Sequence, residues 1–150
     1  MHVAALNMSA TLTLIASQFV IQCAKNFFEE SLWRGYLTNQ LLKLTMSDWK
    51  LCLIAGLVWW AWHLPYWLIM LNTKEVESIV PAGRIVLVVA AILVFFCWNV
   101  MFTEIFRVTR SIWPLVLAHA LEDAVTLPLL IDGTITLDPR WALVFSTNTG

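Results

Sequence analysis

Ionisable side chains that interrupt apolar stretches are the residues of this sequence best placed to do chemistry. The sharpest case is HALED at residues 119–123, where His119 and Asp123 are four residues apart and share one helix face. Glu122 lies at the neighbouring three-residue spacing. A charged group at membrane depth costs about 3 kcal/mol or more, so it generally faces a cavity and has a partner. We therefore expect His119 and Asp123 to line a buried polar site.

A second histidine, His63, lies within WWAWHLP at residues 59–65. In a soluble core, a lone histidine is more often satisfied by packing and a carbonyl than catalytic. In a membrane, the cost of desolvation favours a functional role. Pro65 frees a backbone carbonyl close to His63, which is one way to build a polar pocket there.

A third group is EESLWR at residues 29–34, where Arg34 follows Glu30 by four residues. Taken alone, this spacing favours a solvated ion pair on an amphipathic helix, worth about 0.3–0.5 kcal/mol. The functional interpretation is that Arg34 holds one carboxylate while the other acts as a general base. The three groups together could activate water, relay protons or bind a metal ion, and physical chemistry alone does not choose among these.

The elements that must position these residues are helices in a bilayer. The 150 residues are 60% hydrophobic and 13% charged, with a mean hydropathy of +0.77, which indicates a membrane protein. About 20 apolar residues cross a bilayer, and the windows that qualify are residues 3–24, 51–71, 85–103 and 112–131. Residues 27–44 have apolar side chains at helical spacing and predict an amphipathic or partly inserted helix. We predict one all-α domain over residues 1–150, a polytopic bundle of about four spans plus this helix.

Charge and cysteine content narrow the function further. A net charge of −1 without a basic stripe argues against a nucleic-acid partner. With four spans, six Lys and Arg residues lie on one side and three on the other, which places residues 27–44 on the cytoplasmic side of the plasma (inner) membrane. The three cysteines lie in apolar stretches without metal-like spacing and are interpreted as small buried hydrophobic residues.

The three groups, in this order, resemble the motifs of the CPBP family of intramembrane proteases, also called the Abi or type II CAAX prenyl protease family. Its first motif is a Glu-Glu pair with Arg after three residues, which EESLWR matches fully. Its second is Phe-x-x-x-His, where Trp59 stands at the Phe position before His63. Its third is His-x-x-x-Asn or His-x-x-x-Asp, which His119 and Asp123 match. The resemblance covers residues 24–124.

The resemblance implies a peptidase that cleaves peptide or protein substrates at the membrane, including prenylated ones. It makes Glu29 and His63 the activators of the attacking water, and His119 and Asp123 an oxyanion or metal site. Glu30 is a further catalytic candidate, and Arg34, Glu122 and Trp59 are supporting candidates. The resemblance leaves open whether the cofactor is Zn²⁺ or there is none. The candidate metal ligands are His63, His119, Glu29 and Asp123.

Two other classes of function remain open from the sequence. One is a non-catalytic membrane immunity or binding protein that reuses the protease pocket. The other is a proton-coupled transporter, which needs a polar path across the membrane, whereas the third span offers only Asn99.

Overall fold

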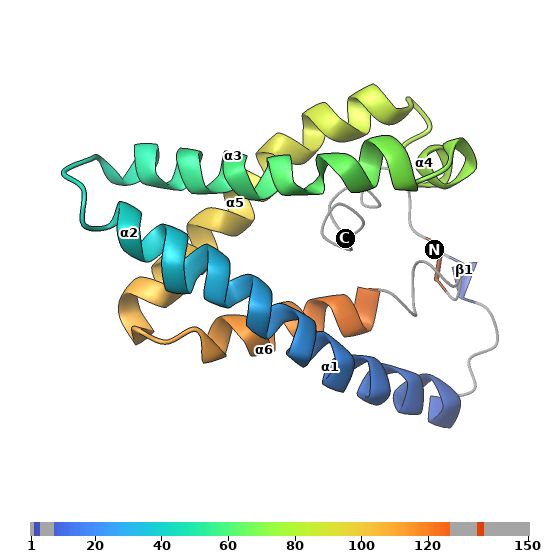
Figure 1. Cartoon of the computed structure of the whole chain (residues 1–150). Helices are drawn as coiled ribbons and strands as arrows, with labels where there is room; N and C mark the ends of the chain where they lie inside the picture. The colour runs from blue at the N-terminus through green and yellow to red at the C-terminus, as the bar shows by residue number, and fades with distance from the viewer. Residues whose placement is uncertain (1, 4–7, 127–134, 137–150) are drawn as a thin grey trace.

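The computed structural model describes residues 2–3, 8–126 and 135–136, and these are helical almost throughout (Figure 1). The elements in chain order are β1 (His2–Val3), α1 (Met8–Glu30), η1 (Ser31–Thr38), α2 (Asn39–Leu41), α3 (Asp48–Pro65), η2 (Tyr66–Met70), α4 (Thr73–Ile79), α5 (Arg84–Thr109), α6 (Trp113–Thr126) and β2 (Ile135–Thr136). β1 and β2 form a two-residue antiparallel pair. The predicted all-α bundle is confirmed.

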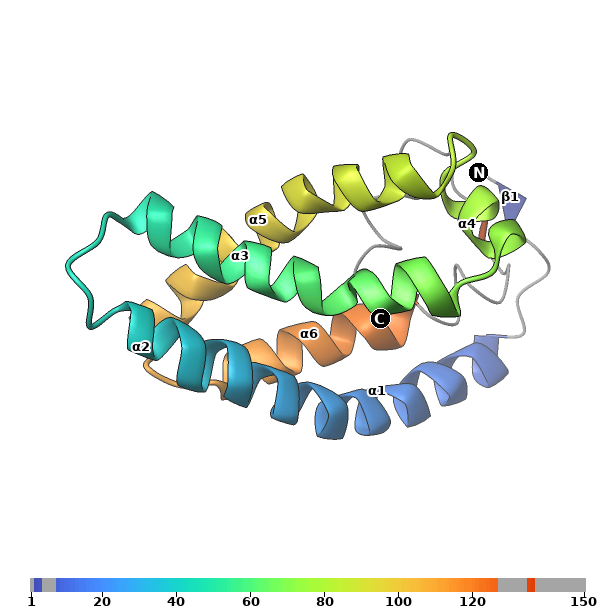
Figure 2. The same ribbon diagram turned by 45° about the horizontal axis from the view of Figure 1, so that its top comes forward.

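The long helices form two antiparallel pairs. α1 packs along α6, and α3 packs along α5 (Figures 1 and 2). The loop between α2 and α3 and the turn between α5 and α6 lie at the same end of the bundle (Figure 2). Arg110 makes that second turn, because it adopts the left-handed conformation with φ 53° and ends α5. The chain therefore reverses at once, and α6 returns beside α1.

The segment at residues 27–44 is helical through Leu41, but it continues α1 instead of forming a separate helix. Its middle part, η1, is a π-helix, a form that occurs frequently at functional sites. η1 contacts both α3 and α5, so the end of the α1 run enters the bundle interior. The predicted span over residues 3–24 differs at its start, since Val3 lies in β1. Residues 4–7 and 127–131 of the predicted spans lie outside the described residues.

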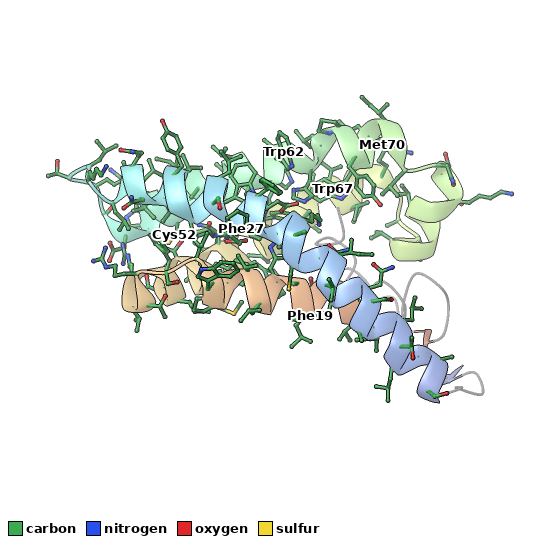
Figure 3. The ribbon with its side chains drawn as sticks, turned by 60° about the horizontal axis from the view of Figure 1, so that its bottom comes forward. Phe19, Phe27, Cys52, Trp62, Trp67 and Met70 are labelled. Atoms are coloured by element: carbon green, nitrogen blue, oxygen red, sulfur yellow. The ribbon has the colours of Figure 1, made fainter. Side chains whose placement is uncertain are left out.

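Two helical runs of the described chain, Asp48–Met70 and Arg84–Thr109, are long and apolar enough to cross a membrane. Large apolar side chains such as Trp62 and Met70 lie on the outer side of the first run (Figure 3), where they are 61% and 73% exposed. An apolar outer surface of this kind suits contact with lipid. The spans at residues 3–24 and 112–131 stay predictions.

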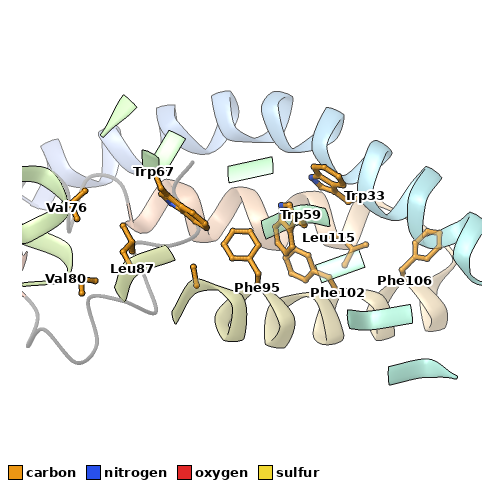
Figure 4. Packing of buried hydrophobic residues seen from close by; sticks show 11 residues of the cluster. Trp33, Trp59, Trp67, Val76, Val80, Leu87, Phe95, Phe102, Phe106 and Leu115 are labelled. Atoms are coloured by element: carbon orange, nitrogen blue, oxygen red, sulfur yellow. The ribbon is translucent and has the colours of Figure 1, made fainter. Parts of the chain in front are cut away.

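The core between the helix pairs is rich in aromatic residues. Trp59 of α3 packs on Phe95 and Phe102 of α5, with ring centroids 4.8 and 6.0 Å apart (Figure 4). The two helices approach closely at Gly56, where an added Cβ would lie 3.4 Å from the Cα of Phe96. This approach carries the polar residue Asn99 toward α3.

Candidate active site

A line of polar residues runs along the inward face of α1 and η1. Gln22, Asn26, Glu30, Arg34 and Thr38 follow at four-residue intervals, and none is more than 8% exposed. In an α-helix of 3.6 residues per turn, each such step rotates about 40° past a full turn. The π-helix turns less per residue because its hydrogen bonds join i to i+5. The change from α1 to η1 after Glu30 therefore offsets the drift and keeps the line facing inward.

Arg34 is the centre of a buried network that joins three helices. Its Nη1 donates to Glu30 Oε1 at 3.0 Å, and both side chains are fully buried. Its Nη2 donates to Asn99 Oδ1 of α5 at 3.4 Å. The Asn99 amide in turn donates to the Cys52 carbonyl oxygen of α3 at 2.9 Å. The interpretation of Glu30 and Arg34 as a solvated surface pair is therefore wrong, because the neighbouring helices cover this face.

Trp59 forms the aromatic wall of the same network. The Arg34 Cζ lies 4.3 Å from the Trp59 ring centroid and 4.7 Å from that of Phe102. A guanidinium within about 6 Å of an aromatic face gains a cation–π attraction. The Trp59 ring also lies edge-on to both histidines, with centroids 6.3 Å from His63 and 5.8 Å from His119. Trp59 therefore lies between the two histidines and contacts the cation as well.

His119 links α6 to α1 through Glu30. Its Nδ1 lies 2.9 Å from Glu30 Oε1, and its side chain is 2% exposed. A carboxylate oxygen accepts, so Nδ1 carries the proton of this hydrogen bond. Its Nε2 faces Asp123 Oδ2 at 4.0 Å, which is beyond hydrogen-bond distance. His119 thus has carboxylates opposite both ring nitrogens, only one of them in direct contact.

His63 is 4% exposed, and its Nδ1 lies 3.0 Å from the carbonyl oxygen of Trp59. A carbonyl only accepts, so Nδ1 carries the proton and Nε2 is left as an acceptor. The Trp59 ring packs against both His63 and His119, with ring centroids 6.3 and 5.8 Å away. The three motifs are therefore brought to one region of the bundle.

Asp123 lies among donors from α1. Its Oδ2 accepts from Asn26 Nδ2 at 2.9 Å and from Lys25 Nζ at 3.3 Å. The same Nζ lies 3.5 Å from Glu29 Oε1. The Glu29 side chain is 17% exposed, whereas that of Glu30 is fully buried. The adjacent glutamates thus have different surroundings, one partly accessible and one enclosed.

The structure brings together Glu30, Arg34, His119 and Trp59 by direct contacts, and Asp123 lies 4.0 Å from His119. Glu29 joins them through Lys25, and His63 joins them through Trp59. Glu122 is half-buried and accepts a hydrogen bond from Thr126 at 3.1 Å.

Sequence reasoning missed Lys25 and Asn26 as members of this group and gave Asn99 no role in it. The position of Asn26, four residues before Glu30, was an available signal. Asn99 interrupts the most apolar predicted span, which was another. Lys25 lies four residues before Glu29, but no local signal pointed to its contact with Asp123, which is 98 residues away.

The candidate metal ligands His63, His119, Glu29 and Asp123 are not gathered into one coordination set. Within the described ranges, no three His, Cys, Asp or Glu side chains come together in a way that would hold a metal ion. Nδ1 of each histidine is also engaged, by a carbonyl at His63 and a carboxylate at His119.

Residues 10–125 match the model of the family described as type II CAAX prenyl endopeptidase Rce1-like. The matched segment contains every residue of the site. No curated protein and no solved structure showed a significant match.

Proposed function

Because the chain belongs to the Rce1-like family of type II CAAX prenyl endopeptidases, we propose that it hydrolyses peptide bonds at the membrane with water activated by Glu29 and His63. The observation that carries this proposal is the unequal burial of the two glutamates. Glu30 Oε1 is within 3.0 Å of both Arg34 and His119, so this carboxylate is engaged in holding other residues. Glu29 is the carboxylate left accessible to a water molecule.

The nucleophile forms when a water molecule loses a proton to Glu29. His63 supports this step, because its Nε2 is an acceptor that can orient the same water. The hydroxide oxygen then bonds to the scissile carbonyl carbon, and the carbonyl electron pair moves to oxygen as an oxyanion. On collapse, the C–N bond breaks and Glu29 returns its proton to the leaving amine. Acid and base roles thus fall on one residue, and the catalyst is regenerated.

His119 is the proposed stabiliser of the oxyanion. With its Nδ1 committed to Glu30, its Nε2 is the nitrogen assigned to the substrate oxygen, and it would donate to the oxyanion from there. Asp123 has no proton to donate as a carboxylate, so its proposed part is to hold the donors of α1 near His119. Glu30 and Arg34 act by orienting His119.

The proposed substrate is a peptide with a CAAX-type C-terminal tail, and a prenyl group on its cysteine would enter the lipid beside the apolar helices. The proposed location is the plasma (inner) membrane, with the site opening toward the cytoplasm. Buried Arg34 no longer counts in the charge rule, which leaves five Lys and Arg residues against three on the opposite side.

Cleavage in ¹⁸O-labelled water tests this proposal. The purified protein in liposomes receives a farnesylated CAAX peptide, and a matched peptide without the farnesyl group serves as control. We expect a shortened product that carries one ¹⁸O in its new carboxylate, formed faster from the farnesylated peptide. Binding without cleavage would instead identify a non-catalytic immunity or binding protein. Equal cleavage rates for the two peptides would contradict the part of the proposal that concerns the prenyl group.

A further inference from the structure

Lys25 lies between two carboxylates at the seam of α1 and α6. Its Nζ is 3.3 Å from Asp123 Oδ2 and 3.5 Å from Glu29 Oε1. The Lys25 side chain is 33% exposed, whereas Asp123 is 1% exposed. The ammonium group therefore reaches a buried carboxylate from a partly open position.

The charges of the site explain why a cation is needed at this place. Three acidic side chains, Glu29, Glu30 and Asp123, lie beside two basic ones, Lys25 and Arg34. Arg34 is committed to Glu30 at 3.0 Å. Among the ion pairs of the described residues, Lys25 is the lysine or arginine that pairs with Asp123. A buried carboxylate that loses its partner is strongly destabilising.

Asn26 already holds α1 to α6 at Asp123, so Lys25 is not needed for that connection alone. Asn26 donates to the same oxygen of Asp123 at 2.9 Å, closer than the Lys25 contact at 3.3 Å. Both contacts join α1 to α6, so the connection between the helices persists without Lys25. What Asn26 does not provide is a positive charge.

We propose that Lys25 is a positioning residue that neutralises Asp123, so that negative charge can develop beside His119 during peptide hydrolysis. Asp123 Oδ2 lies 4.0 Å from His119 Nε2, the nitrogen assigned to the oxyanion. An uncompensated carboxylate at that position repels the oxyanion. This proposal rests on the proposed function. It adds Lys25, which lies outside the three motifs, as the charge partner of Asp123. Its effect falls on the chemical step more than on substrate binding, so kcat changes more than KM.

A double-mutant cycle tests the proposal. Lys25→Met removes the charge, and Asp123→Asn removes the carboxylate while keeping an oxygen that accepts from Asn26. The four proteins are wild type, both single variants and the double variant, each in liposomes with the farnesylated CAAX peptide. Lys25→Arg, which keeps the charge, and Lys43→Met, an exposed lysine bonded to Gln40, are the controls. Thermal unfolding is measured on the same preparations and does not depend on cleavage.

We expect Lys25→Met to lower kcat by about tenfold when residue 123 is Asp and by less than about twofold when it is Asn. The Tm should fall by about 5 °C in the Lys25→Met protein and recover in the double variant. Equal losses of kcat in both backgrounds would overturn the proposal, because they would show that Lys25 does not act through Asp123. If wild type cleaves nothing, the proposed function fails while the unfolding cycle still decides whether Lys25 compensates Asp123.

Discussion

The Nδ1 of His119 and the Oε1 of Glu30 are 2.9 Å apart, although 89 residues separate them in the chain. The same carboxylate oxygen accepts from Arg34 at 3.0 Å. Glu30 is therefore the residue that joins the first motif to the third, and it does so inside the bundle. This contact separates the roles of the adjacent glutamates, because Glu29 makes no comparable link to His119 among the described contacts.

Glu30→Gln should destabilise the protein far more than Glu29→Gln. Removing the Glu30 charge leaves Arg34 buried without its counterion, which costs about 3–5 kcal/mol. Glu29 forms a partly exposed pair with Lys25, worth about 1 kcal/mol or less. Thermal unfolding followed by tryptophan fluorescence measures both variants. Equal Tm values for the two variants would contradict the assignment.

Asn99→Leu should weaken the connection between η1, α3 and α5. The substitution removes the acceptor for Arg34 Nη2 and the donor to the Cys52 carbonyl. Leaving the buried Nη2 of Arg34 without this acceptor costs about 1–3 kcal/mol. Met101→Leu, an exposed change on the same helix, is the matched control. Denaturation of both variants in detergent measures the difference in stability. An unchanged stability for Asn99→Leu would show that the hydrogen bonds of Asn99 do not stabilise the fold.

Position 56 should tolerate alanine and reject leucine. An alanine Cβ would lie 3.4 Å from Phe96 Cα and 3.5 Å from Asn99 Cβ, which is ordinary contact. The larger leucine side chain would overlap with atoms of α5, and overpacking of this kind costs about 1–3 kcal/mol. We expect Gly56→Ala to retain its Tm and Gly56→Leu to lose both stability and cleavage. A fully active Gly56→Leu protein would show that the close approach of α3 and α5 is not required.

Chelation should leave cleavage unchanged, because the proposed mechanism uses Glu29 and His63 without a metal ion. The measurement is the cleavage rate before and after dialysis against EDTA, with and without added Zn²⁺. Loss on dialysis followed by recovery with Zn²⁺ would contradict the mechanism. That result would instead assign a metal ion to Nε2 of His63 and Nε2 of His119, because Nδ1 of each ring is already hydrogen-bonded.

Much of the helical organisation could be predicted from the sequence. Uniform apolarity is a local property, so α3 with η2 and α5 fall close to the predicted spans at residues 51–71 and 85–103. The continuity of α1 through η1 could not be predicted, because a π-helix follows from tertiary contacts with α3 and α5 more than from local propensity. The charged residues of the fourth predicted span were placed correctly inside the bundle, since His119 and Asp123 are both 1% exposed.

The details of the site depend on contacts that local spacing does not encode. The spacing of Glu30 and Arg34 predicts an ion pair, and the pair exists, but spacing does not show whether other helices cover it. Adjacent residues point about 100° apart around a helix, so one glutamate is enclosed and the other is partly exposed. The packing of α1 on α6 decides which one is enclosed. The contact of Lys25 with Asp123 has no local signal, because Asp123 comes from α6.

The most direct test of the account is the cleavage rate of Glu29→Gln in liposomes, measured against Glu104→Gln. Glu104 is an exposed carboxylate paired with Arg107, so its loss controls for charge removal alone. We expect Glu29→Gln to keep its abundance and Tm and to cleave the farnesylated CAAX peptide at least about 100-fold more slowly, as the loss of a general base implies. Glu104→Gln should cleave at the wild-type rate. Wild-type cleavage by a correctly folded Glu29→Gln protein would contradict the account.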